Sequence, residues 1–179
     1  FFIANALGSR GLTALNLAIP IYSFVHGCGL MIGMGGGIRF AIRKYQGERR
    51  ESDVIFSHAV GLAGGFAAGF LLAGLLLSGR IVALLGADRS IFDMTRIYVR
   101  MGLLFSPLFL LNNVLLAFVR NDGAPQRSMA AMVGGSLSNV VLDWVFIFPC
   151  GMGIFGAAFA TGLAPLISMA ILSPHFLRG

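Results

Sequence analysis

The sequence is poor in charged residues, in cysteine and in lysine, and each shortage excludes a class of protein. Only 11% of the 179 residues are charged, whereas soluble domains carry about a quarter. The two cysteines, Cys28 and Cys150, fall in or at the end of apolar runs, so a disulfide framework is not indicated. Twelve of the thirteen basic residues are arginines that separate apolar runs, whereas a nucleic-acid surface gathers its basic groups on one solvated face. A chain that is 57% hydrophobic, with a mean hydropathy of +0.86, is therefore expected to be a polytopic membrane protein.

Five membrane-spanning helices are predicted from the stretches between charged residues. A helix needs about 20 apolar residues to cross the hydrocarbon core, and a membrane admits only helices or closed barrels. The apolar runs lack the two-residue alternation of a membrane strand. The run from 128 to 177 holds one charge, Asp143, and is long enough for two spans joined by a hinge at 148–153. The fold class is an all-α membrane helical bundle, with spans expected at 14–42, 55–78, 95–119, 128–148 and 154–176.

Shorter segments lie before and between these spans. Residues 1–4 are apolar but too few to cross a bilayer, so they are interpreted as the tail of an earlier span, followed by a loop over 5–11. Residues 79–93 contain a short apolar run closed by Gly86, which predicts an interfacial piece. The chain is therefore expected to be a piece of a larger membrane protein.

The positive residues indicate an orientation. Cytoplasmic loops carry an excess of Lys and Arg. The loops after the first and third spans, together with the C-terminal end, hold eight positive residues, and the other side holds five. The larger group, which is assigned to the cytoplasm, consists of Arg39, Arg43, Lys44, Arg49, Arg50, Arg120, Arg127 and Arg178.

Glycines four residues apart occur in the first two spans. Such small-residue pairs let two helix backbones approach closely, although glycine is in any case frequent in membrane helices. The pairs are Gly29/Gly33, Gly33/Gly37, Gly61/Gly65 and Gly65/Gly69.

One carboxylate lies inside a predicted span. Asp143 stands four residues after Asn139 and seven after Ser136, so the three side chains share one helix face, and Met132 extends the same stripe. A charged residue within a span costs free energy and by default indicates function. Hard oxygen ligands of this kind suit a hard cation or a proton. Thr161 could add a hydroxyl if the last two spans are antiparallel neighbours. Alternatively, Asp143 lies close enough to the helix end to be hydrated or to cap or pack.

The other polar residues in the spans give weaker signals. Asn112 and Asn113 point about 100° apart on a helix, so at most one can face a cleft, and interhelical hydrogen bonding is an equally good interpretation. No span pairs a histidine suitably with Ser136, and no His, Cys or Glu spacing predicts a metal site. The chain is therefore not expected to be an enzyme.

Several motifs together resemble one transporter family. The run 118–129, Phe-Val-Arg-Asn-Asp-Gly-Ala-Pro-Gln-Arg-Ser-Met, resembles the loop between the fourth and fifth helices of the multidrug and toxic compound extrusion (MATE) family. The following helix, with Asn139 and Asp143 four apart, is similar to the fifth helix of that family. Further similarity covers Thr161 in the sixth helix and the glycine-rich segment 27–48 in the second.

The resemblance implies a function and a set of sites. It implies that residues 1–179 are a partial N-terminal lobe, helices two to six, of a twelve-helix transporter whose first helix and second lobe are missing here. Such a transporter would be an H⁺- or Na⁺-coupled antiporter in the plasma membrane that exports amphipathic or cationic drugs by alternating access and needs no cofactor besides the coupling ion. The implied cation-binding residues are Asn139, Asp143 and Thr161, and the implied substrate cleft holds Asn112, Met132 and Ser136.

Two alternatives stay open. A lipid-linked saccharide flippase of the same broad superfamily would share the helices but is expected to have a more basic cavity for its pyrophosphate-linked headgroup. A membrane scaffold that transports nothing would have no reason to bury Asp143. No nucleic-acid partner is expected.

Overall fold

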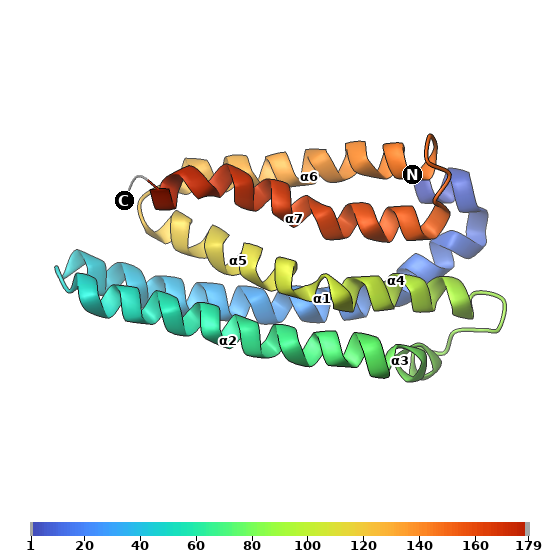
Figure 1. Cartoon of the computed structure of the whole chain (residues 1–179), viewed down its shortest axis with the longest axis horizontal. Coiled ribbons are helices and arrows are strands. Elements are labelled where there is room, and N and C mark those ends of the chain that lie inside the picture. Colours follow the sequence, from blue (N-terminus) through green and yellow to red (C-terminus); the bar gives the residue numbers. More distant parts are fainter. Residues whose placement is uncertain (1, 178–179) are drawn as a thin grey trace.

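The computed structural model describes residues 2–177, and every regular element in that range is a helix. The seven helices are α1 (Phe2–Tyr45), α2 (Arg49–Leu76), α3 (Ser78–Leu84), α4 (Phe92–Leu104), α5 (Ser106–Asn121), α6 (Pro125–Ile147) and α7 (Gly153–Leu177). Figure 1 shows α6 and α7 side by side, α1 and α2 side by side, and α4 and α5 between the two pairs. The predicted all-α membrane bundle is confirmed.

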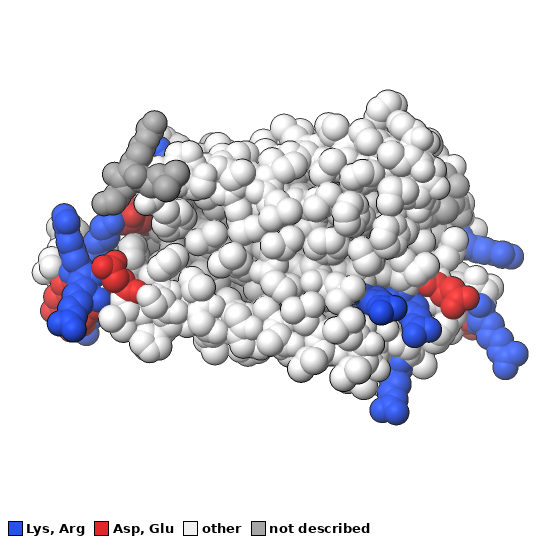
Figure 2. All heavy atoms as spheres, in the orientation of Figure 1, with Lys and Arg blue, Asp and Glu red and all other residues white. Residues whose placement is uncertain are grey.

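The number of spans also agrees with the prediction. Four helices are long and apolar enough to cross a membrane, and the bent pair α4 and α5 makes a fifth span. In Figure 2 the charged side chains gather at the two ends of the molecule and leave an uncharged band between them. This distribution is expected of a bundle whose middle contacts lipid. Arg178, which was counted in the orientation prediction, lies outside the described residues.

The predicted loop over residues 5–11 is wrong. The segment is helical from Phe2 onward, and α1 is interrupted at a single residue, Gly8, with φ 63° and ψ −159°. Glycine reaches positive φ without the steric cost that a side chain imposes. The chain therefore changes direction at one residue, and the long apolar part of α1 runs from Gly8 to Tyr45.

The third span, predicted at 95–119, is formed by two helices that meet at a bend. Helices α4 and α5 meet at Phe105 with an angle of 49°. Pro107, in the first turn of α5, has no N–H to donate to the carbonyl of Leu103. The Ser106 hydroxyl donates to that carbonyl instead, at 2.7 Å, and its side chain is fully buried. The bend therefore leaves no unpaired carbonyl at Leu103.

Replacement of Ser106 by alanine should destabilise this bend. A buried carbonyl that loses its only side-chain donor costs about 1–3 kcal/mol. The measurement is the midpoint of thermal unfolding in detergent. Ser173→Ala is the matched control, because Ser173 makes the same type of bond, to Ala170 at 2.8 Å, from an exposed position. Equal midpoints for the two variants would contradict the assigned role of Ser106.

The connections between the spans lie close to the positions predicted for them. The interfacial piece predicted at 79–93 contains the short helix α3, which is followed by a turn at Gly86 with φ 77°. The hinge predicted at 148–153 falls between the end of α6 and the start of α7. Gly151 and Gly153 in this hinge adopt φ 60° and 56°, values at which a side chain would be strained. The hinge sets α6 and α7 antiparallel and in contact.

The predicted glycine interface forms on α1. A Cβ added at Gly33 would lie 2.9 Å from the Asn113 carbonyl oxygen, and one at Gly29 would lie 3.0 Å from the Asn113 side chain. Close approach of α1 to α5 therefore depends on this stripe. The prediction for Gly61, Gly65 and Gly69 is wrong, because open space surrounds each. The buried face of α2 is carried instead by Ala59, Ala63 and Ala67.

Four helices are tied together at one end of the bundle by a chain of charged and polar side chains. Asp122, just after α5, binds Lys44 of α1 through one carboxylate oxygen and His175 of α7 through the other, the latter at 2.8 Å. Arg127 of α6 lies 3.3 Å from the second ring nitrogen of His175. We call the four residues Lys44, Asp122, His175 and Arg127 the Asp122 cluster.

Candidate functional site

A cavity of about 510 Å³ lies between α1, α5, α6 and α7. Its polar residues come from all four helices and are His26, Asn112, Asn113, Ser136, Asn139, Thr161 and Ser168. Apolar side chains, among them Phe109 and Met132, form much of the remaining wall. A cavity with mostly apolar walls and a few convergent polar groups is the usual form of a small-molecule site.

The periodicity of α6 explains why several predicted residues reach this cavity. Met132, Ser136 and Asn139 recur at helical spacing, and all three line it. The antiparallel hinge brings Thr161 of α7 opposite Asn139, and Asn112 approaches from α5. Five of the six residues predicted from the sequence thus share one cavity.

Asn139 and Thr161 are in direct contact. The Asn139 amide donates to the Thr161 hydroxyl oxygen at 3.5 Å, which is at the long limit of a hydrogen bond. The Thr161 hydroxyl in turn donates to the Ala157 carbonyl at 2.9 Å. Because the Thr161 proton is used within its own helix, its oxygen faces Asn139 as an acceptor.

Asp143 lies one helical turn beyond Asn139, outside the residues that line the cavity. Its Oδ1 is buried and receives no hydrogen bond from any side chain or backbone group within residues 2–177. The hydroxyl of Tyr98 on α4 interacts with Thr161 and is in electrostatic range of the Asp143 carboxylate. A buried carboxylate oxygen without a donor is costly unless a proton or a cation binds to it.

The adjacent asparagines have different roles. The Asn113 amide nitrogen lies 2.6 Å from Nδ1 of His26 and joins α5 to α1 by a hydrogen bond. The Oδ1 of Asn112 is buried and finds no partner in the described part of the chain. Both asparagines line the cavity, so the expectation that at most one of them can face a cleft is wrong. Asn113 does so while bonded to His26, and Asn112 presents an unpaired acceptor.

Three residues of this region were not predicted from the sequence. Tyr98, between Arg96 and Arg100, is at the charged edge of its span, yet it is only 5% exposed. Ser168 is 2% exposed with an unpaired hydroxyl, but it stands alone in an apolar helix. His26 of α1 also lines the cavity. Recognising all three requires knowledge of which helices pack together.

A conventional metal site is not found in the described ranges. No three His, Cys, Asp or Glu side chains within residues 2–177 lie close enough to hold an ion together.

The sequence is similar to multidrug export proteins. It is 28% identical over 180 residues to the multidrug export protein MepA of Staphylococcus saprophyticus, covering 99% of this chain and 40% of that protein. The MepA protein of Staphylococcus aureus matches at the same identity and coverage. The chain thus spans about two fifths of the length of the curated relatives it matches.

Solved structures show the same arrangement of helices. An inward-facing multidrug resistance MATE family transporter of the MOP superfamily superposes with a TM-score of 0.91 at 26% identity, covering 96% of this chain and 39% of that chain. A MOP superfamily transporter from Pyrococcus furiosus, described as having a binding pocket of reverse polarity that suggests a different function, superposes with a TM-score of 0.84 at 27% identity. It covers 98% of this chain and 39% of that one.

The model of the MatE family matches residues 1–145, which include the glycine stripe of α1 and both Asn139 and Asp143. The match covers most of the chain, and the helices superpose on MATE transporters throughout. This multi-pass plasma-membrane protein therefore belongs to the MatE family of multidrug efflux transporters.

Proposed function

We propose that this chain forms most of the N-terminal lobe of a twelve-helix antiporter that exports amphipathic cations in exchange for H⁺ or Na⁺. The observation that carries the proposal is the buried, unpaired Oδ1 of Asp143 one turn from the Asn139–Thr161 contact. The names of the MepA relatives support drugs as the cargo. In this proposal Asn139, Asp143 and Thr161 bind the coupling ion, and Asn112, Met132 and Ser136 contact the cargo.

The electrostatics of the site support coupling to a cation. A carboxylate at the centre of a membrane helix costs about 2.5–3.5 kcal/mol on insertion scales, which is an upper bound for Asp143, four residues before the end of α6. Binding of H⁺ or Na⁺ removes most of that cost, and it does so only in a conformation that lets the ion reach Asp143. A ligand shifts a conformational equilibrium only through different affinities for the two states, and alternating access around a central site supplies those two states.

The cavity favours cationic over anionic cargo. Within residues 2–177 neither lysine nor arginine lines it, and the acid near it is Asp143, one helical turn beyond Asn139. Phe109 and Met132 offer an aromatic face and a polarisable thioether to an amphipathic compound. A lipid-linked saccharide flippase would need cationic side chains for its pyrophosphate, so this alternative lacks support in the cavity. The buried acid likewise argues against a scaffold that transports nothing.

Transport by the complete gene product in proteoliposomes tests the proposal. A fluorescent drug cation should be taken up against its own gradient when an outward H⁺ or Na⁺ gradient is imposed, because an antiporter moves the two cations in opposite directions. An ionophore that collapses the effective gradient should stop this movement, and comparison of the two gradients identifies the ion. Uptake that is unaffected by either gradient would refute ion-coupled antiport.

A further inference from the structure

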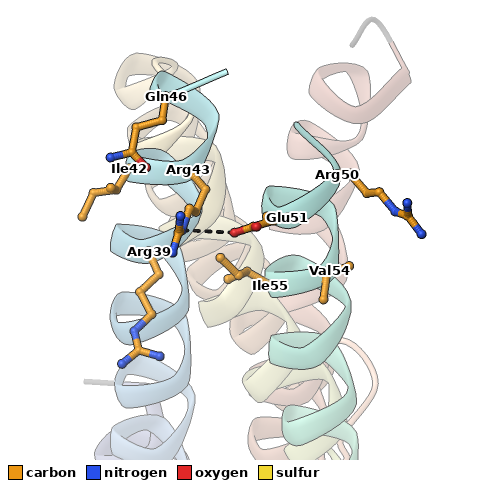
Figure 3. A pocket seen from close by; sticks show the side chains of 8 residues that line it. All are labelled: Arg39, Ile42, Arg43, Gln46, Arg50, Glu51, Val54 and Ile55. Atoms are coloured by element: carbon orange, nitrogen blue, oxygen red, sulfur yellow. Dashed lines mark ion pairs between the residues drawn. The ribbon is translucent and has the colours of Figure 1, made fainter. Parts of the chain in front are cut away.

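A second groove lies away from the candidate site, between the ends of α1 and α2. It has a volume of about 860 Å³ and is lined at its outer end by Arg39, Arg43, Gln46 and Arg50. Figure 3 shows that α1 and α2 form its two walls, with Arg39 deeper along α1 than Arg43. The apolar side chains of Ile42, Val54 and Ile55 complete the lining, together with Glu51.

The cations of this groove are not equally available. Arg43 is paired with Glu48 at 2.6 Å and with Glu51 at 3.3 Å, so its charge is compensated. The dashed line in Figure 3 marks the contact to Glu51. Arg39 makes no ion pair or side-chain hydrogen bond with any described residue. Its guanidinium can bind an anion without first breaking an internal pair.

Below Arg39 the groove continues as an apolar channel. An adjoining cavity of about 500 Å³ shares Arg39 and Ile55 with the first, and its other lining residues are apolar or glycine, among them Met31, Gly35 and Leu62, except for His58. Nδ1 of His58 lies 2.7 Å from the Val54 carbonyl oxygen of its own helix. A Cβ added at Gly35 would meet nothing within 4 Å, so this position leaves open space along the channel. Met31 and Leu62 are more than half exposed. The two cavities thus form one groove with a cationic end and an apolar length.

We propose that this groove binds an anionic phospholipid. The phosphate would accept hydrogen bonds from Arg39, whose planar guanidinium suits bidentate contact with phosphate, and one acyl chain would lie over Gly35 and Met31. Basic pockets between membrane helices near the bilayer surface have the chemistry to hold such headgroups. A free phosphate would gain nothing from the apolar length, which is why a lipid is the occupant assigned. The proposal is independent of ion coupling at Asp143.

Lipid binding to the complete gene product tests this assignment. Native mass spectrometry in mild detergent should show preferential binding of phosphatidylglycerol over phosphatidylcholine. Arg39→Gln should weaken phosphatidylglycerol binding about tenfold, the usual effect of losing a hydrogen bond to a charged group. Arg39→Lys should retain part of the affinity, because the charge remains without the planar fork. Arg80→Gln, at the opposite end of the bundle, is the control and should bind normally.

A second pair of variants tests whether the apolar part of the groove contacts the lipid. Gly35→Leu should fill the channel and lower phosphatidylglycerol affinity, whereas Gly27→Leu should not. Gly27 is also on α1 with nothing within 4 Å of an added Cβ, and it does not line the groove. Equal binding of the two lipids, unchanged binding in Arg39→Gln, or full competition by glycerol phosphate would each overturn the lipid assignment.

Discussion

Asparagine in place of Asp143 is expected to abolish ion-coupled export while leaving the protein folded. The amide has nearly the same size but neither binds a proton at physiological pH nor attracts Na⁺ as a carboxylate does. Coupling free energies of 1–3 kcal/mol correspond to roughly 5–150-fold changes in affinity, so gradient-driven export should fall by about tenfold or more. The measurement is accumulation of a fluorescent drug cation in proteoliposomes under an imposed ion gradient.

The unfolding temperature distinguishes a loss of ion-coupled export from misfolding of the variant. Removal of an uncompensated buried charge does not destabilise a protein, so Asp143→Asn should unfold at the same temperature as the wild type or higher. Asp88→Asn, at an exposed acid outside the spans, is the matched control and should export normally. Undiminished gradient-driven export by Asp143→Asn would eliminate this carboxylate as the coupling group.

Leucine in place of Gly33 should separate α1 from α5. The added Cβ would meet the Asn113 carbonyl oxygen at 2.9 Å, the Ala117 Cβ at 3.0 Å and the Val114 Cα at 3.2 Å. Backbone atoms and a Cβ cannot rotate away as the end of a flexible side chain can, so the two helices must move apart. Overpacking of this kind costs about 1–3 kcal/mol. Thermal unfolding in detergent measures the loss.

The control for this substitution is another glycine of the same four-residue pattern. Gly65→Leu on α2 places a side chain in open space, and its unfolding midpoint should remain near that of the wild type. If both variants lose the same stability, the effect would come from the general cost of replacing glycine in these helices, and the assigned α1–α5 contact would be wrong.

Hydropathy predicted the spans well, because the cost of charge in lipid leaves a strong signal in sequence. It could not predict the bend at Phe105, since Pro107 and Ser106 lie inside an unbroken apolar run. Hydropathy also could not distinguish the glycines of α1 that pack against α5 from the glycines of α2 that face open space. That distinction depends on which helix is the neighbour, and the same four-residue spacing occurs in both.

The sequence likewise could predict some residues of the candidate site and not others. Residues on one helix, such as Ser136 and Asn139, could be grouped by periodicity, and Thr161 followed from a short antiparallel hinge. Tyr98 could not be placed beside Thr161, because the two are far apart in sequence and meet through the packing of α4 against α7. Whether Asp143 binds an ion remains a prediction, which the asparagine variant tests.

The Asp122 cluster joins α1, α5, α6 and α7 at one end of the bundle. Thr161 lies fourteen residues from His175 along α7, about 21 Å at the helical rise. If α7 tilted about this cluster by roughly 5°, Thr161 would be displaced by roughly 2 Å. A small change of helix angle would thus be enough to separate Thr161 from Asn139, while the contacts of the Asp122 cluster would change little.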